Sequence, residues 1–383
     1  MIHFNSKLPH TGISIFSEMT RMANENNAIN LSQGFPDFDC PAELTALVTQ
    51  HMQQGHNQYA PMEGLVSLRE RAAEKTRSLH NADYDPELEI TVTAGATQAI
   101  FTVLTAVIQP SDEVIIFEPA YDSYAPAVKL LGGVVKQFEL SPPDYEIDWS
   151  MVKRLVSVRT KMIIVNSPQN PIGRIINEED IRELEAITRG TDILILSDEV
   201  YEHVIFDGRQ HLSLARFPQL RERTFICVSF GKLFHNTGWK IGYCLAPVQL
   251  MKEFRKVHQY MVFSVNTPVQ YALADFLKDK SHYLGLADFF QQKRDYFASL
   301  MQETPFELLP CPGSYFQNAV YSNISDEPDT DFTKRLIKEY GVASIPVSAF
   351  YSKGTDYKVI RFCFAKKEET LKLAAERLSK VKA

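Results

Sequence analysis

Between about residue 90 and residue 247, short apolar segments alternate with longer amphipathic ones. Several of the apolar segments, such as DILILS at 192–197, lack the regular alternation of a half-exposed strand. Such strands are typical of a parallel sheet that is buried between two layers of helices. We therefore predict an α/β fold with a doubly wound core. Its strands are expected at 90–94, 113–117, 133–140, 161–165, 192–197 and 225–229.

Helices are expected between these strands. In the segment 177–190, Asn177 suits the N-cap, Asp180 lies near the first turn and Gly190 suits the C-terminal stop. Another helix is expected to begin at Thr97. Strands that alternate with helices in this way support the α/β prediction.

The two ends of the chain have a different pattern. The first 45 residues are rich in Asn, Pro and Ser and contain the turn cluster QGFPDFDCP. A long helical stretch at about 248–302 is followed by a smaller α+β unit. We predict an N-terminal arm at 1–45 that joins a small domain, a large domain at 46–280 and a C-terminal small domain at 281–383. Within the smaller unit, strands are expected at 306–321 and 358–364, and helices at 331–340 and 368–381.

Composition narrows the class of protein. The chain has 383 residues, 45% of them hydrophobic, and a net charge of -7. An acidic chain argues against nucleic acid as a partner, because phosphate binding needs a basic face. No apolar run is long enough for a membrane span or resembles a signal peptide. The five cysteines lack CxxC spacing, which argues against a metal site and a disulfide framework. We expect a cytoplasmic protein.

Unusual residues follow the predicted strands. In open α/β sheets, ligands bind at the carboxyl ends of the strands, so these positions are the candidates for chemistry. Taken singly, each has an ordinary explanation as a turn, a helix cap, a core aromatic or a surface lysine. Together they would bring an anion site, an aromatic ring, an amide, a carboxylate, a phenol and an amine to one rim. They are Gly95, Ala96, Thr97, Tyr121, Asn170, Asp198, Tyr201 and Lys232.

Pyridoxal 5'-phosphate catalysis needs this combination. It requires a lysine for the Schiff base, an acid that keeps the ring nitrogen protonated, and a cradle for the phosphate. A phenol and an amide beside the ring oxygen would lower the pKa of the Schiff base. A helix that begins after Gly95 supplies amide groups for an anion.

At these positions the sequence resembles the class I/II aminotransferases of fold type I. The motifs NSPQNPIG, SDEVYEH and SFGK occur in the family's order, and SFGK is followed by a cation and IG. The segments INLSQGFPDF, QYAPMEG, TAGATQA and VIRFCFAKKEETL are similar to bacterial methionine aminotransferases and their kynurenine/glutamine aminotransferase relatives. The resemblance implies a large domain with a mostly parallel central sheet flanked by helices, and a smaller α+β domain.

The resemblance also implies roles around the cofactor ring. Lys232 would form the Schiff base and shuttle the proton, and Asp198 would face the pyridinium nitrogen. Asn170 and Tyr201 would bond the phenolic oxygen of the ring, and Tyr121 would stack on its face.

Further roles concern the phosphate, the substrate and the dimer. Tyr59 of the partner subunit would reach the phosphate, which makes the protein a homodimer with composite sites. Arg361 would grip the substrate α-carboxylate in a bidentate fork, with Gly34 and Asn170 beside it. The remaining phosphate ligands would be Gly95, Ala96, Thr97, Ser229 and Lys240.

The sequence departs from the family at a few positions. Lys240 stands where most members have arginine. A lysine lacks the two parallel hydrogen bonds that a guanidinium forms with a phosphate, but it keeps the positive charge. His235 and Asn236 occupy positions where small or apolar residues are usual, and their sequence context gives them no role.

The family resemblance places a substrate loop at 258–268. In relatives that act on aspartate, an arginine of this loop reaches the substrate side chain from the partner subunit, whereas the loop here contains Tyr260, Met261, Val262 and Phe263. We expect transamination of methionine, aromatic or other apolar amino acids with a 2-oxo acid, and Phe16 is a further candidate to cover the side chain. The loop could instead be interface core.

Other functions remain open from the sequence. β-Elimination from a cysteine S-conjugate, or kynurenine transamination, would use the same residues. A non-enzymatic regulatory domain that binds the cofactor is another alternative, although no basic helix-turn-helix segment precedes the first strand. An α/β protein without any cofactor would leave the joint pattern unexplained.

Overall fold

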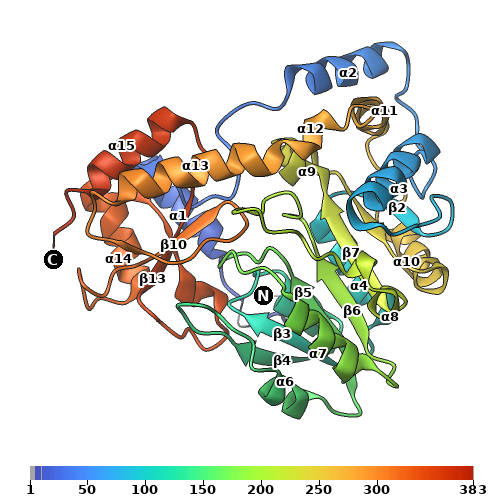
Figure 1. Ribbon diagram of the computed structural model, residues 1–383, viewed down its shortest axis with the longest axis horizontal. Helices are drawn as coiled ribbons and strands as arrows, with labels where there is room; N and C mark the ends of the chain where they lie inside the picture. Colours follow the sequence, from blue (N-terminus) through green and yellow to red (C-terminus); the bar gives the residue numbers. More distant parts are fainter. Residues whose placement is uncertain (1–4, 10, 383) are drawn as a thin grey trace.

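The computed structural model describes residues 5–9 and 11–382, and its core is a seven-stranded sheet (Figure 1). The first residues of the predicted N-terminal arm and the last residue of the predicted C-terminal domain lie outside this part. The strand order is β2-β8-β7-β6-β5-β3-β4, and only β8 runs against the others. All six predicted strands are confirmed, and β8 is an addition. The strands are β2 (Ile90–Thr93), β3 (Glu113–Glu118), β4 (Val134–Glu139), β5 (Thr160–Asn166), β6 (Leu194–Asp198), β7 (Thr224–Ser229) and β8 (Gly242–Leu245).

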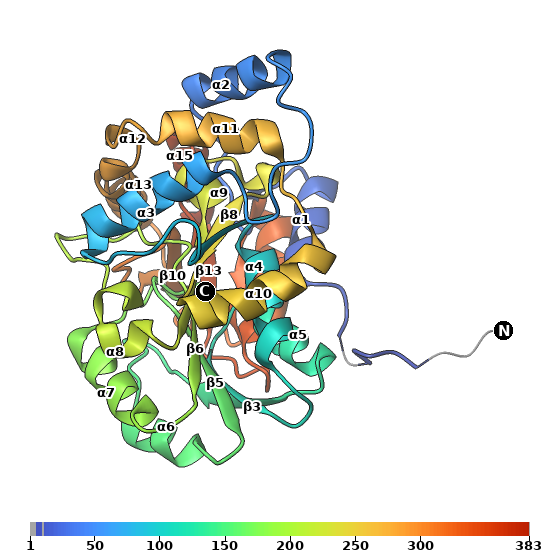
Figure 2. The same cartoon turned by 90° about the vertical axis from the view of Figure 1, so that its right-hand side faces the viewer.

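Helices cover both faces of the sheet, as the apolar strands predict (Figure 2). Ile116 and Ile164 pack on one face and their neighbours Ile115 and Ile163 pack on the other, and all four are buried. This two-sided burial explains why the strands lack polar alternation. On the first face lie α4 (Ala96–Val107), α5 (Tyr124–Leu130) and α10 (Val248–Met261); on the second lie α6 (Trp149–Leu155), α7 (Glu178–Thr188) and α8 (Pro218–Arg221).

Helix α7 begins as its sequence predicts. The side chain of Asn177 accepts hydrogen bonds from the backbone of Glu179 and Asp180, and the carboxylate of Asp180 accepts one from the backbone N–H of Asn177. This reciprocal capping box satisfies amide groups that have no partner inside the helix. Gly190 follows the last turn with a φ of +70°, which a glycine adopts without strain.

A second, four-stranded sheet has the order β12-β13-β10-β9. The predicted strand at 306–321 is wrong as one element, because Pro310, Pro312 and Gly313 separate β9 from β10. The predicted helix at 331–340 consists of an α-helical part and a π-helical part, Leu336–Tyr340. The elements are β9 (Glu307–Leu308), β10 (Phe316–Val320), β12 (Ile345–Pro346), β13 (Val359–Cys363), α14 (Asp329–Arg335), the 3₁₀ segment Val347–Phe350 and α15 (Glu368–Leu378).

The helical stretch at 248–302 is four helices rather than one. After α10 come α11 (Thr267–Phe276), α12 (Ser281–Leu284) and α13 (Leu286–Met301), and Figure 1 shows α13 running from the side of the large sheet to the side of the smaller one. No helix of the described residues is both long and apolar enough to cross a membrane.

The N-terminal arm contains elements that the sequence reading missed. Helix α1 (Ile15–Glu25) packs by Met19 and Ala23 against Ile345 and its neighbours. Strand β1 (Ile29–Asn30) pairs in parallel with β11 (Val342–Ala343), which joins the arm to the C-terminal part. This pairing supports the division into 1–45, 46–280 and 281–383, which stays a proposal. The large part also contains α2 (Ala42–Gln53), α3 (Val66–His80) and α9 (Phe230–Leu233).

Candidate active site

The carboxyl ends of the central parallel strands surround a cavity of about 150 Å³. Segments that follow β2, β3, β5, β6 and β7 all contribute to its wall, as expected for an open α/β sheet. Most of the residues singled out from the sequence therefore lie together. Those that line the cavity are Gly95, Ala96, Thr97, Tyr121, Asn170, Asp198, Tyr201, Ser229, Lys232 and Lys240.

One end of the cavity is built to hold an anion. Gly95 forms the N-cap of α4 with a φ of +80°, and no side chain in the described part of the chain caps this helix. The free N–H groups of the first turn therefore lie at the cavity wall. The Nζ of Lys240 stands 3.5 Å from the point that a Cβ on Gly95 would occupy. Ser229 and Thr97 add hydroxyl groups, and such a set of donors favours a phosphate.

Asp198 ends β6 and is 3% exposed. Its Oδ2 accepts a hydrogen bond from the hydroxyl of Tyr124 at 2.6 Å, and its Oδ1 accepts one from the backbone N–H of Val200 at 3.3 Å. Burial raises the pKa of Asp198 to about 6, because the charged form is poorly solvated. A cationic partner in the cavity would relieve this cost.

Lys232 lies in α9, directly after β7. Its Nζ donates to the hydroxyl of Tyr315 at 2.9 Å and to the carbonyl oxygen of Gly34 at 3.0 Å. Burial lowers the pKa of Lys232 to about 8, so that a larger share of the amine is neutral near pH 7 than in an exposed lysine. A neutral amine is the form that attacks a carbonyl group.

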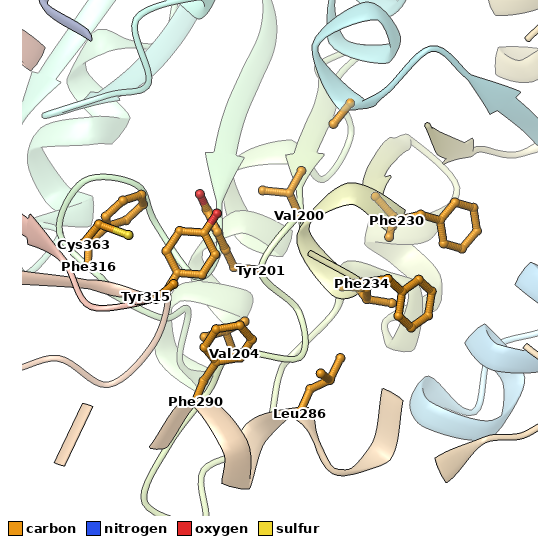
Figure 3. Close-up of a cluster of buried hydrophobic side chains, with 14 of the residues drawn as sticks. Val200, Tyr201, Val204, Phe230, Phe234, Leu286, Phe290, Tyr315, Phe316 and Cys363 are labelled. Carbon is orange, nitrogen blue, oxygen red and sulfur yellow. The ribbon is translucent and has the colours of Figure 1, made fainter. Parts of the chain in front are cut away.

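Two tyrosine rings lie beside Lys232, whose Nζ is 5.6 Å from the ring centroid of Tyr201 and 5.5 Å from that of Tyr315. Tyr201 and Tyr315 meet edge to face with 5.0 Å between their centroids, and Figure 3 shows their hydroxyl groups side by side. Burial raises the pKa of Tyr201, so its hydroxyl stays protonated and can donate a hydrogen bond. Tyr315 also donates to the carbonyl oxygen of Gly34 at 2.6 Å, which links the N-terminal arm to this pair.

Arg361 is the largest fully buried side chain. Its Nη1 donates to Oδ1 of Asn170 at 2.6 Å and its Nη2 to the carbonyl oxygen of Ser32 at 2.8 Å. Phe316 stacks on the guanidinium, with 3.8 Å from Cζ to the ring centroid, and Phe16 lies at 5.4 Å. Within the described residues no carboxylate pairs with Arg361, so this buried cation is suited to receive one.

Tyr59 lies away from the cavity of its own chain. Its side chain is 82% exposed and meets Phe263 edge to face at 5.5 Å. The predicted loop at 258–268 is wrong in its extent, because α10 continues through Met261 and α11 begins at Thr267. Tyr260 and Phe263 are also exposed, which leaves an apolar, aromatic surface beside Tyr59.

His235 packs among aromatic rings, and Asn236 beside it is buried. His235 has a φ of +57° and packs its ring against Phe38 and Phe289, and burial lowers its pKa to about 4. Asn236 is 4% exposed, and its amide has no hydrogen-bond partner among the residues that the structure covers. Neither residue lines the cavity wall.

Comparison with known proteins identifies the family. The model for aminotransferase class I and II matches residues 26–378. The chain belongs to this family. A methionine aminotransferase from Escherichia coli (strain K12) is 50% identical over 374 residues, with 97% of each chain covered. Kynurenine–oxoglutarate transaminase 1 of the mouse is 35% identical over 398 residues, with 94% of this chain and 93% of the mouse protein covered.

Solved structures of this family have the same fold. YbdL from Escherichia coli, identified as a methionine aminotransferase, superposes with a TM-score of 0.97 at 48% identity, over 99% of this chain and 100% of that one. This aminotransferase therefore acts on amino acids and 2-oxo acids and depends on pyridoxal 5'-phosphate.

The residues present fit this cofactor. Amide groups, hydroxyls and the ammonium of Lys240 meet at one end of the cavity, where a phosphate would be neutralised. Asp198 faces the same cavity with a raised pKa that a protonated ring nitrogen would lower. Lys232 supplies the amine, and Tyr121 supplies an aromatic side wall.

The sequence reading missed three residues of the site. Tyr124 bonds Asp198 and Tyr315 bonds Lys232. Asn166 accepts from the backbone N–H of Asn170 at 2.9 Å and donates to the carbonyl oxygen of Asp198 at 2.8 Å. Asn166 is the first residue of the motif NSPQNPIG, and Tyr124 follows Tyr121 by three residues, whereas nothing near Tyr315 in the sequence signals its role.

Proposed function

We propose that this aminotransferase takes the amino group from methionine, and next from aromatic and other apolar amino acids, and passes it to a 2-oxo acid. The observation that carries the proposal is the segment at 258–268, which contains no arginine. The E. coli methionine aminotransferase, at 50% identity, supports the same substrate class.

The physical argument concerns the substrate side chain. Tyr260, Met261 and Phe263 are exposed on the single chain, and in the proposed homodimer they would cover the substrate of the other subunit. A second carboxylate, as in aspartate, would there be desolvated without a cation, at a cost of several kcal/mol. Apolar, sulfur-containing and aromatic side chains instead gain from burial and from contacts between sulfur and aromatic rings. The surface around Tyr59 and Phe263 has this apolar character.

We propose the following roles for the residues of the cavity. Asp198 holds a proton on the ring nitrogen, and Asn170 and Tyr201 hold the ring oxygen while Tyr121 stacks on the ring. When bound, pyridoxal 5'-phosphate supplies an electron sink for the pair released at the substrate α-carbon. The phosphate is held by Gly95, Ala96, Thr97, Ser229 and Lys240.

Lys232 is proposed to attach the cofactor and then to move protons. Its amine is held by Tyr315 and Gly34 and has a lowered pKa, so it can accept a proton at Nζ near neutral pH. Arg361, with Asn170 and Gly34 beside it, binds the substrate α-carboxylate. This contact keeps the α-carbon in place while Lys232 acts.

We also propose a homodimer with composite sites in the cytoplasm. Tyr59 is exposed on its own chain and next to other exposed aromatic groups, which suits a residue that reaches across an interface. In the dimer, Tyr59 of the partner subunit would reach the phosphate end of the cavity.

Kynurenine transamination is the second candidate. The mouse kynurenine transaminase is 35% identical, and an aromatic side chain suits the same apolar surface. β-Elimination from cysteine S-conjugates would draw on the same cavity residues and is a further alternative.

The experiment is a comparison of kcat/KM for methionine, phenylalanine, kynurenine and aspartate with one common 2-oxo acid. We expect methionine or an aromatic donor to exceed aspartate by at least about a hundredfold, which equals about 3 kcal/mol in transition-state binding. Keto-acid and pyruvate release from a cysteine S-conjugate, measured in parallel, gives the share of elimination. If aspartate gave the highest kcat/KM, the proposed substrate class would be wrong.

A further inference from the structure

Asn318 lies directly opposite Arg361 in the four-stranded sheet. In the antiparallel pair β10–β13, the Cα partner of Asn318 is Arg361. Side chains of directly opposed residues stand on the same face of a sheet, with their Cβ atoms about 5 Å apart. Phe316, two residues before Asn318, confirms the face, because its ring stacks on the guanidinium of Arg361.

The amide of Asn318 is buried and has no partner. The residue is 2% exposed, and neither Oδ1 nor Nδ2 forms a hydrogen bond with any part of the chain that the structure covers. The Nε of Arg361 is likewise buried and unbonded among the described residues, although the two terminal nitrogens of Arg361 have partners. An unbonded acceptor and an unbonded donor therefore lie on neighbouring positions of one sheet face.

A buried polar group without a hydrogen-bond partner costs free energy and is rare in native proteins. We therefore expect these two groups to form a hydrogen bond in the working enzyme. Oδ1 of Asn318 is an acceptor and the Nε–H of Arg361 is a donor, and the two are complementary. A rotation of the Asn318 side chain would join them. Each terminal nitrogen of Arg361 already donates one N–H, to Asn170 or to Ser32, and its second N–H would remain for an end-on fork with a carboxylate.

We propose that Asn318 is a positioning residue for Arg361, which it holds through Nε while the guanidinium binds the α-carboxylate of the substrate. The inference rests on the proposed function, because Arg361 is there the group that binds the α-carboxylate. Asn318 would then affect the affinity for the carboxylate through Arg361, although Asn318 itself does not line the cavity.

The experiment measures binding of a carboxylate that cannot react. 4-(Methylthio)butanoate has the carbon chain of methionine without the amine, and its Kd for the holoenzyme is measured by isothermal titration calorimetry. We expect Asn318→Leu to raise this Kd by roughly tenfold, the effect of one hydrogen bond to a charged group. We also expect KM for methionine to rise similarly, while kcat changes by less than about threefold.

A second ligand separates positioning from general damage. 3-(Methylthio)propylamine has the side chain and amine of methionine but no carboxylate, so its rate of reaction with the bound cofactor should be the same in Asn318→Leu and in the wild type. Gln317→Leu is the matched control variant, because Gln317 is 3% exposed on the same strand and its amide bonds Leu309 and the backbone of Asn318 instead. Gln317→Leu should leave the Kd of 4-(methylthio)butanoate unchanged.

The proposal is overturned if Asn318→Leu binds 4-(methylthio)butanoate as tightly as the wild type, or if it slows the amine as much as it weakens the acid. Should Asn318→Leu not fold, Asn318→Ala removes the same two polar atoms and is held to the same outcomes. If the wild type binds 3-phenylpropionate rather than 4-(methylthio)butanoate, the proposed preference for methionine is wrong. The same comparison with 3-phenylpropionate then still decides the role of Asn318.

Discussion

Tyr124 donates a hydrogen bond of 2.6 Å to Asp198 at the end of β6. The pair joins the first turn of α5 to the carboxylate that we assign to the ring nitrogen. Burial raises the pKa of Asp198 to about 6, and the bond from Tyr124 acts against this rise. The hydrogen bonds from Tyr124 and Val200 thus compensate only in part for the lost solvation of Asp198, and a cation bound in the cavity would compensate further.

Asp198→Asn is predicted to stabilise the cofactor-free protein and to reduce activity strongly. Because the pKa of Asp198 is 3.8 when exposed and about 6 when folded, its contribution to stability is present below pH 4 and lost as the pH rises through 6. At pH 8 the variant should gain about 3 kcal/mol in free energy of unfolding, since one pKa unit equals about 1.4 kcal/mol. Urea denaturation of cofactor-free protein measures this gain.

The same denaturation at pH 4 is the control for Asp198→Asn. There the wild-type carboxyl group is protonated in the folded protein, so the advantage of the variant should disappear. An equal gain at both pH values, or a loss of stability at pH 8, would show that burial of the charge is not the cause. Activity of Asp198→Asn close to that of the wild type would remove its proposed role.

Lys75 forms a buried ion pair with Glu202, the residue that follows Tyr201. Their Nζ and Oε1 atoms are 2.5 Å apart, and the side chains are 2% and 4% exposed. The pKa of Glu202 is held well below its usual value, since Lys75 and His80 stabilise the charged form against its burial. Lys75→Met removes the ammonium partner of this carboxylate and leaves it only the longer contact with His80 at 3.3 Å, so the variant should lose about 3 kcal/mol of stability in urea denaturation.

The double variant Lys75→Met/Glu202→Leu tests whether the remaining carboxylate causes the loss of stability in Lys75→Met. Replacing both charges by apolar groups should recover most of the stability that Lys75→Met loses, because no unpaired charge remains. Lys256→Met is the comparison at the surface, where the ion pair with Glu253 is exposed and the expected change is within about 0.5 kcal/mol. A double variant as unstable as Lys75→Met would contradict the argument.

The composite site predicts a specific result for mixed subunits. Tyr59→Ala and Lys232→Ala should each have low activity at limiting cofactor concentration. When equal amounts are unfolded together and refolded, half of the dimers are mixed, and each mixed dimer contains one site with both residues intact. Activity should return to about a quarter of the wild-type value. No recovery would mean that Tyr59 and Lys232 of one chain serve the same site.

The sequence alone predicts much of the architecture. The apolar strands and the residues at their ends depend on local patterns, so β5 with Asn170 after it and β6 with Asp198 at its end could be located. Helix α1 was missed even though its apolar positions Ile15, Met19 and Met22 have helical spacing, because the surrounding Asn and Ser residues suggested turns.

Contacts between distant segments could not be predicted. Tyr315 meets Lys232 across 83 residues and Gly34 across 281 residues, and only the packing of the two sheets and the N-terminal arm brings them together. The pairing of Asn318 with Arg361 depends on strand register in the same way. Register follows from which strands pair and how their apolar faces align, and local patterns do not show that β10 pairs with a strand about forty residues further on.

The most direct test of the account follows the visible absorbance of the purified protein when L-methionine is added without a 2-oxo acid. In the wild type we predict a yellow protein whose visible band is lost rapidly and returns on adding a 2-oxo acid. In Lys232→Ala, cofactor should still bind, but the conversion of methionine should slow by at least about a thousandfold, because no amine moves the proton. A colourless wild type, or a Lys232→Ala variant that converts methionine at the wild-type rate, would contradict the account.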